Sequence, residues 1–137
     1  MNDLIGFISI ALISLITIVI GLRWPAVSRI IYVALSVRVL FIFIGHYFFT
    51  LPDSDQDALG LDDIAWSMAQ NGFLNVIYNF PGLDSFFYTW LIAIPYSLFG
   101  RSILMSQSLS LFFGLGIVLL GWLFAKKLWN SHIATRV

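Results

Sequence analysis

Most of the acidic residues of this sequence lie in one short segment. Six of the seven occur between positions 53 and 84, and they are Asp53, Asp55, Asp57, Asp62, Asp63 and Asp84. No Lys or Arg occurs from Val39 to Gly100, and the chain contains no Glu. Carboxylates without basic neighbours are solvated, bind cations or exchange protons. The sequence therefore predicts that any chemistry of this chain depends on the Asp side chains of this acidic segment.

The first three of these residues, Asp53, Asp55 and Asp57, alternate with polar residues. They offer hard oxygen ligands of the kind that Mg²⁺ or Mn²⁺ requires, so they are the candidate metal ligands. A run of exposed Asp residues before a helix also serves as a solvated cap, because a carboxylate accepts hydrogen bonds from the free N–H groups of the first turn. The spacing is compatible with both interpretations.

Asp62 and Asp63 are the candidates for acid and base catalysis. They lie in a predicted helix that ends at Gly72 and whose apolar residues share one face, namely Ala58, Leu61, Ala65, Met68 and Ala69. This pattern predicts an amphipathic helix on the membrane surface, with both carboxylates on its polar face. A partly desolvated carboxylate can take a proton from an acceptor hydroxyl. If both side chains simply face water, they have no such role.

The composition is that of a membrane protein. Of the 137 residues, 60% are hydrophobic and 10% are charged, and the mean hydropathy is +0.94. The formal net charge is zero, which gives no basis for binding nucleic acid. Since the chain has no Cys, disulfides, thiolate metal sites and cysteine nucleophiles are excluded. We therefore predict an all-α integral membrane protein.

Four transmembrane helices are predicted, at 4–22, 30–51, 86–99 and 102–124. A bilayer core of about 30 Å requires about 20 apolar residues in a helix, and the first, second and fourth segments have about that length. The third is shorter and contains Pro95, but its aromatic start suits the membrane interface. An external acidic loop with one or two interfacial amphipathic helices occupies 52–85, and a tail follows at 125–137.

The last two predicted spans are expected to form a close hairpin that turns at Gly100 and Arg101. Small residues recur every four positions in both, at Thr89, Ala93 and Ser97 and at Ser102, Ser106, Ser110 and Gly114. Small residues at this spacing allow two helices to approach closely within a membrane. The sequence therefore predicts that these two helices pack against each other.

The distribution of Lys and Arg predicts the orientation. Arg23 and Arg29 mark the first loop and Arg101 marks the hairpin turn, so the positive-inside rule places both turns in the cytoplasm and the acidic loop outside. With four spans, the basic residues of the tail would also lie outside, namely Lys126, Lys127 and Arg136. Each side would then carry three basic residues. The complete lack of Lys and Arg in the long loop favours the orientation with that loop outside.

Arg38 lies eight residues into the second predicted span, near the middle of the bilayer. A guanidinium there is costly unless it meets a cavity, an anionic ligand or a partner. A lipid-linked phosphate or a carboxylate of another helix would satisfy it, and no acidic residue lies inside the predicted spans. The alternative is that the side chain reaches the cytoplasmic headgroups.

The order of these segments resembles the N-terminal part of the GT-C membrane glycosyltransferases. This superfamily includes protein O-mannosyltransferases, aminoarabinose transferases and bacterial relatives in polysaccharide synthesis. The resemblance covers about 30–130 and rests on Asp62-Asp-Ile-Ala-Trp-Ser-Met-Ala-Gln-Asn-Gly72, Leu91-Ile-Ala-Ile-Pro-Tyr-Ser-Leu-Phe-Gly100 and Leu123-Phe-Ala-Lys-Lys-Leu-Trp129. In the family pattern an acidic pair precedes an aromatic residue, an Ala and a Gly. Here the second acid is Asp63 where Glu is common, and the earlier Asp run offers rival positions.

The resemblance implies transfer of sugar from a polyprenyl-phosphate carrier on the outer face of a bacterial inner membrane. It implies that an acid of the first external loop is the general base or a metal ligand, which here points to Asp62 and Asp63. Arg38, Trp66 and Tyr88 are the predicted substrate-binding residues. Members of the family have many more helices than 137 residues can form. We therefore expect a module that works with further transmembrane helices and is too short to be active alone.

A second function is compatible with the same residues. The chain would then be a noncatalytic membrane protein whose acidic loop binds cations or a partner and whose small-residue ridges drive assembly. Loss of sugar transfer after replacement of Asp62 or Asp63 would favour the enzyme module. Binding of a divalent ion without any response to lipid-linked sugars would favour the assembly subunit.

Overall fold

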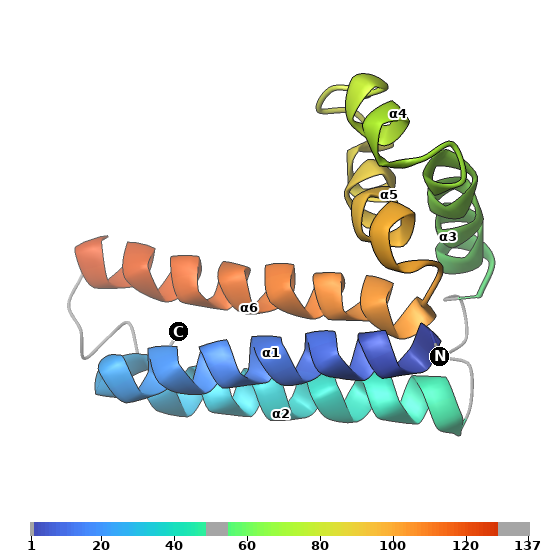
Figure 1. Ribbon diagram of the computed structural model, residues 1–137. Coiled ribbons are helices and arrows are strands. Elements are labelled where there is room, and N and C mark those ends of the chain that lie inside the picture. Colours follow the sequence, from blue (N-terminus) through green and yellow to red (C-terminus); the bar gives the residue numbers. More distant parts are fainter. Residues whose placement is uncertain (1, 49–54, 129–137) are drawn as a thin grey trace.

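The computed structural model describes residues 2–48 and 55–128, and these ranges contain helices and no strand. In chain order the helices are α1 (Asn2–Arg23), α2 (Pro25–Tyr47), α3 (Asp55–Ala69), α4 (Phe73–Tyr78), α5 (Phe87–Phe99) and α6 (Ile103–Leu128). They form two groups (Figure 1). The helices α1, α2 and α6 lie side by side as a bundle, and α3, α4 and α5 form a second group, the α3–α5 unit, at one end of that bundle.

The bundle contains the three long apolar segments of the sequence. Its helices are long and apolar enough to cross a membrane, which indicates an integral membrane protein. Its core is made of the buried residues Ile10, Ile31, Leu35, Leu104, Leu111 and Leu115. Large side chains on the outside remain exposed, among them Leu15, Val33 and Ile117, as expected for helices surrounded by lipid.

The boundaries of the three long helices differ slightly from the predicted spans. α2 begins at Pro25 rather than at residue 30. Proline suits the first turn of a helix, because N–H groups in that turn have no partner within the helix and the missing N–H of proline costs nothing there. α6 extends beyond its predicted end at residue 124 as far as Leu128.

At the other end of the bundle, Gly6 allows a close approach of α1 and α6, since a β-carbon at this position would overlap Leu104.

The α3–α5 unit has a core of its own. Its buried residues are Ala65, Ala69, Val76, Ile92, Ala93 and Tyr96, with Met105 of α6 at the edge. The indole Nε1 of Trp90 in α5 donates a hydrogen bond of 2.7 Å to the carbonyl of Val76 in α4. Asp84 precedes α5, as predicted for a residue at a helix start, and its Oδ1 accepts a hydrogen bond of 2.9 Å from the Phe86 N–H. Three short helices thus fold onto one another.

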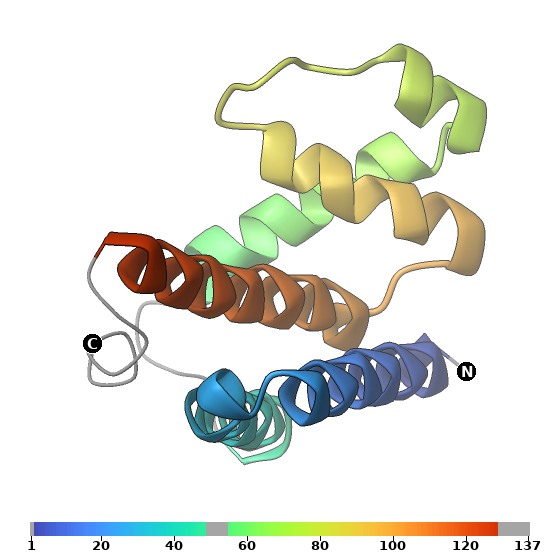
Figure 2. The same cartoon turned by 90° about the vertical axis from the view of Figure 1, so that its left-hand side faces the viewer.

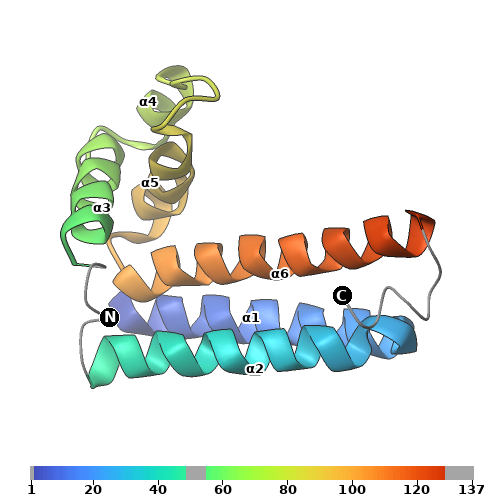
Figure 3. The ribbon, with the colours of Figure 1, turned by 180° about the vertical axis from the view of Figure 1, so that it is seen from behind.

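The predicted hairpin of α5 and α6 is wrong. α5 rises away from α6 and packs mainly on α3, as Figures 1 and 3 show. The small-residue ridge of α5 serves this packing, because Ala93 lies in one buried cluster with Ala65 and Ala69 of α3. With 13 residues, α5 is also much shorter than the three bundle helices. A view along the bundle places the whole unit on the α6 side (Figure 2).

This arrangement changes the distribution of charge. Arg23, Arg29, Lys126 and Lys127 all lie at or near one end of the bundle, where α1 and α6 end and α2 begins. Arg101 lies at the opposite end, just before α6 begins, and it pairs with Asp62 of the α3–α5 unit. The prediction that Arg101 shares a side with Arg23 is therefore wrong. Four crossings that include α5 put three basic residues on each side, whereas three crossings by the bundle helices alone put Arg23, Arg29, Lys126 and Lys127 on one side.

Candidate functional site

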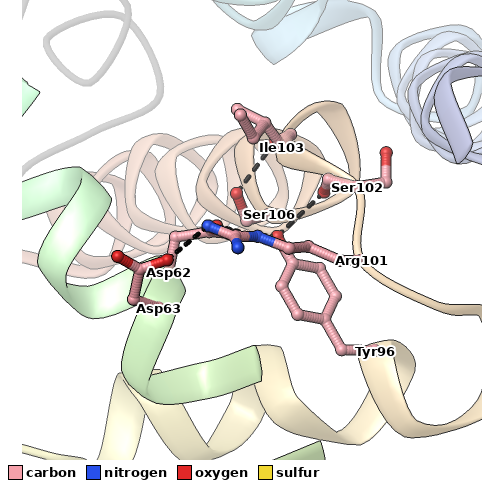
Figure 4. A network of polar contacts seen from close by, with 7 residues as sticks. All are labelled: Asp62, Asp63, Tyr96, Arg101, Ser102, Ile103 and Ser106. Carbon is pink, nitrogen blue, oxygen red and sulfur yellow. Dashed lines mark hydrogen bonds and ion pairs between the residues drawn. The ribbon is translucent and has the colours of Figure 1, made fainter. Parts of the chain in front are cut away.

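Two carboxylates, a phenol and a guanidinium meet where α3, α5 and the start of α6 come together (Figure 4). Asp62 and Asp63 come from the middle of α3, Tyr96 from the last turn of α5, and Arg101 from the link to α6. We call these four residues the Asp62 site. The cluster joins positions that are up to 39 residues apart in the sequence.

The link between α5 and α6 directs Arg101 toward α3. α5 ends at Phe99 and is capped by Gly100, whose φ of 87° and ψ of 170° belong to a region that is essentially restricted to glycine. Its N–H donates a hydrogen bond of 2.9 Å to the Tyr96 carbonyl and so closes the last turn. The Ser102 carbonyl then starts α6 by accepting a hydrogen bond of 3.0 Å from the Met105 N–H. A sharp turn of two residues therefore fixes where the guanidinium lies.

Asp62 is buried, and both of its carboxylate oxygens are occupied. Its side chain is 7% exposed. Oδ2 accepts a hydrogen bond of 2.7 Å from Arg101 Nε and forms an ion pair with Arg101 Nη2 at 2.6 Å. Oδ1 accepts a hydrogen bond from the Tyr96 hydroxyl, which also lies 2.9 Å from the Ser102 carbonyl oxygen. Of the two environments that the sequence allows for Asp62, a desolvated pocket or water, the structure shows the desolvated pocket, because α5 covers the side chain.

Asp63 differs from its neighbour in exposure. Its Oδ1 lies 2.6 Å from Arg101 Nη2, but its side chain is 68% exposed. With the described residues, its second oxygen forms no hydrogen bond. One guanidinium therefore bridges a buried carboxylate and an exposed one, and only the exposed one has an oxygen available to a ligand or a proton.

The environment keeps both donors of the site protonated. Burial raises the pKa of the Tyr96 phenol above its usual range, and the hydrogen bond to Asp62 raises it further. Partial burial alone would lower the pKa of Arg101, but its hydrogen bonds to Asp62 and Asp63 outweigh this effect and raise it. Both groups therefore act as hydrogen-bond donors at neutral pH.

The predicted substrate-binding residues fall in three places. Trp66 lies in the site, with its ring centroid 6.4 Å from that of Tyr96 in an edge-to-face arrangement. Tyr88 lies two turns before Tyr96 and packs against Phe113 of α6, and burial raises its pKa. Arg38 lies in α2, against Gly114 of α6. The structure therefore brings only Trp66 together with the predicted acids.

Comparisons with models of known protein families, with curated proteins and with solved structures found no match. The resemblance to glycosyltransferases thus rests on the residues of this chain alone.

The predicted metal ligands fall outside the side chains that the structure describes. Asp53 is outside the described residues, and so are the side chains of Asp55 and Asp57, although both belong to α3. Among the side chains that the structure describes, no group of three His, Cys, Asp or Glu residues is arranged to hold a metal ion. A divalent cation at 53–57 stays a prediction.

Two residues of the site, Tyr96 and Arg101, were not predicted from the sequence. Arg101 is the only Lys or Arg between Arg38 and Lys126, so it is the nearest permanent positive charge in the sequence after the acidic segment. The sequence nevertheless predicts Arg101 on the side of the membrane opposite the acidic loop, because 86–99 is predicted as a span. Tyr96 carries no comparable signal, since a tyrosine in an apolar helix is an ordinary core or interface residue.

Chemically, the site combines a fixed part and an accessible part. Asp62 and Tyr96 hold the guanidinium of Arg101 in one orientation. The exposed Asp63 carboxylate and the side chain of Arg101, which is 35% exposed, present a base and a positive charge next to each other. Such a pair can accept a proton from a hydroxyl and attract a phosphate.

Proposed function

We propose that this chain is a module of a membrane glycosyltransferase or polysaccharide polymerase that uses a polyprenyl-phosphate-linked sugar. The observation that carries the proposal is the pairing of exposed Asp63 with Arg101, held in place by buried Asp62 at one end of an apolar bundle. A lipid-linked donor would bring its phosphate and sugar to the membrane surface. A carboxylate and a guanidinium at that level match the acceptor hydroxyl and the phosphate of such a reaction.

The charge at the two bundle ends supports catalysis on the outer face. The end with Arg23, Arg29, Lys126 and Lys127 is strongly basic, and by the positive-inside rule it lies in the cytoplasm. At the other end the charge of Arg101 is offset by two carboxylates. The Asp62 site then faces the outside of a bacterial plasma membrane.

The proposed roles of the two acids differ. Asp63 takes the proton from the acceptor hydroxyl while the oxygen of that hydroxyl attacks the anomeric carbon of the sugar. The bond from that carbon to the phosphate oxygen breaks, and the polyprenyl phosphate leaves near Arg101. Asp62 is a positioning residue, because donors occupy both of its oxygens. Trp66 lies one turn after Asp62 and offers an apolar ring face or edge to the sugar.

The test compares Asp63→Asn with the unmodified chain in its native membrane. Polyprenyl-phosphate hexoses with a radiolabelled sugar are added, and the label in polysaccharide and lipid acceptors is counted. We expect the substitution to reduce transfer by about 100-fold or more, the usual contribution of a general base. Asp84→Asn is the matched control, because Asp84 is also exposed and Asn can equally accept the hydrogen bond from Phe86.

Equal transfer by the Asp63→Asn variant and the unmodified chain, at equal protein levels, would contradict the proposed base. Loss of transfer in the Asp84→Asn control as well would show that the effect is not specific to the site. Because a panel of hexoses is tested, the transfer activities of the variants can be compared without knowing which sugar is the natural one.

A noncatalytic assembly subunit is the second candidate, and one observation favours it. Arg101 binds both carboxylates at once, which is also what a purely structural latch between α3 and α6 would do. In addition, the α3–α5 unit leaves the large side chains of Leu74, Tyr78 and Leu83 mostly exposed. No transfer by the unmodified chain, together with thermal stabilisation by Mg²⁺ or Mn²⁺, would favour this function.

A further inference from the structure

Arg38 is a charged residue in the middle of an apolar helix, and it takes no part in the Asp62 site. Along the axis of α2, it lies about 20 Å from Pro25 and about 14 Å from Tyr47, at 1.5 Å per residue. Both ends of the helix are thus far from its α-carbon. In a bilayer with a core of about 30 Å, this places Arg38 well inside the hydrocarbon region.

The guanidinium of Arg38 lies directly on the backbone of Gly114 in α6. A β-carbon at Gly114 would overlap Cζ, Nη1 and Nη2 of Arg38, so only glycine allows this position. The Arg38 side chain is nevertheless exposed to the surroundings of the bundle, as are Phe41 and Ile117 one turn away on the two helices. We call the shallow surface between α2 and α6 at this level the Arg38–Gly114 groove.

The described part of the chain offers Arg38 no opposite charge. Among the side chains that the structure describes, 3–48 and 60–128, no hydrogen bond or ion pair involves Arg38. The sequences of α1, α2 and α6 contain a single acid, Asp3, in the first turn of α1 near the end of the bundle. An unpaired charge in hydrocarbon is costly, so a charged residue at this depth marks a site that is completed by another group.

The position of Arg38 narrows down what that group is. A headgroup phosphate lies at the edge of the hydrocarbon core, about 15 Å from its middle, and would require the bilayer to thin or the side chain to stretch. A second copy of the chain would bring another Arg38 and no acid at this depth. A carboxylate carried by a transmembrane helix can reach any depth, and it matches the charge and the fork of donors of a guanidinium.

From the exposed guanidinium and the glycine beneath it, we infer that the Arg38–Gly114 groove binds a transmembrane helix of a partner protein that carries an Asp or Glu near its middle. This inference does not depend on the proposed function, because Arg38 does not contact the Asp62 site. It assigns the lateral surface of α2 and α6 to assembly within the membrane.

The test uses a synthetic transmembrane peptide of Leu and Ala with one central Asp, and matched peptides with Asn or Leu at that position. The chain is reconstituted in a zwitterionic bilayer, and association is measured by energy transfer from the peptide to a dye at Ala26→Cys, an exposed position at the basic end. Because the chain has no other cysteine, labelling is specific. We expect the Asp peptide to associate at least tenfold more tightly than the Leu peptide.

Three variants make the result specific to the groove. In the double variant Val37→Arg with Arg38→Val, the charge stays at the same depth but moves to the neighbouring face of α2, and the preference for Asp should disappear. Gly114→Ala should weaken it by displacing the guanidinium. Arg38→Asp should reverse it, so that a peptide with a central Arg now binds best.

Equal association of the Asp and Leu peptides would overturn the inference, and so would an unchanged preference for Asp in the double variant. Addition of polyprenyl phosphate or phosphatidylglycerol distinguishes the lipid alternative. If either one removes the advantage of the Asp peptide, then a phosphate occupies the groove and the inference is wrong.

Discussion

At the scale of single residues, Arg101 is the counter-charge that the acidic segment requires. It forms ion pairs of 2.6 Å with both Asp62 and Asp63, and it lies one residue beyond the stretch that lacks Lys and Arg. The two pairs differ in energy because only Asp62 is buried. Removing one partner of a buried ion pair costs about 3–5 kcal/mol, whereas an exposed pair contributes about 0–1 kcal/mol. Asp62 therefore stabilises the unit, and Asp63 remains available for function.

Tyr96 predicts how the stability of the α3–α5 unit depends on pH. Its pKa is raised above the ordinary 10.0, first by burial and then by Asp62, so its contribution is complete below pH 10.0 and is lost as the pH rises above that value. Tyr96→Phe should destabilise the unit by about 1 kcal/mol at neutral pH, and the difference should shrink above pH 10.0. Denaturant unfolding followed by tryptophan fluorescence measures both effects.

The matched control is Tyr78→Phe, because Tyr78 is 86% exposed and should have little influence at any pH. Arg101 remains charged over the same range, since its hydrogen bonds to Asp62 and Asp63 raise its already high pKa. A constant difference between the Tyr96→Phe variant and the unmodified chain up to the highest pH tested would contradict this account.

At the scale of elements, the direction of α5 depends on how that helix ends. Gly100, with a φ of 87° and a ψ of 170°, turns the chain so that α5 rises away from α6 and Arg101 reaches α3. Gly100→Ala should destabilise the α3–α5 unit by about 1–3 kcal/mol, because an L residue is strained in this conformation. The change is measured by denaturant unfolding at neutral pH.

Gly60→Ala in α3 serves as the control for this substitution. Gly60 has an ordinary helical conformation, and a β-carbon there would meet open space. Alanine favours helix more than glycine does, so this variant should be stabilised by up to about 1 kcal/mol. Equal effects of the two glycine substitutions would show that the turn at Gly100 carries no special strain.

At the scale of the whole molecule, three long helices and one compact unit separate two kinds of charge. Four basic residues, Arg23, Arg29, Lys126 and Lys127, lie at or near one end of the bundle, and the Asp62 site lies at the other end. We predict that Ser85→Cys and Lys127→Cys react with a membrane-impermeant thiol reagent from opposite sides of the membrane. Ala26→Cys should react from the same side as Lys127→Cys.

These positions decide between three crossings and four. All three are exposed, and the chain has no native cysteine. If α5 crossed the membrane, Lys127→Cys would react from the same side as Ser85→Cys. That outcome would contradict the arrangement in which α5 packs on α3 beside the bundle.

The sequence by itself determined the membrane class, the three long helices and the helical nature of 55–69. Hydropathy and helical periodicity are properties of neighbouring residues, so they can be read before any tertiary contact is known. The position of Asp62 and Asp63 on one helix was predicted for the same reason. The capping of α5 near Asp84 was also predicted from local pattern.

Only the tertiary structure decided what the carboxylates contact. α5 is an apolar helix of 13 residues with small side chains on one face. This composition suits packing on α6 within a membrane and packing on α3 equally well, so it does not predict the partner. The packing partner of α5 determines the end of the bundle at which Arg101 lies. At that end Arg101 pairs with Asp62, 39 positions earlier in the sequence, and with Asp63; Asp62 is buried and Asp63 is exposed. Such a pairing depends on how helices meet in space, which no local pattern of residues specifies.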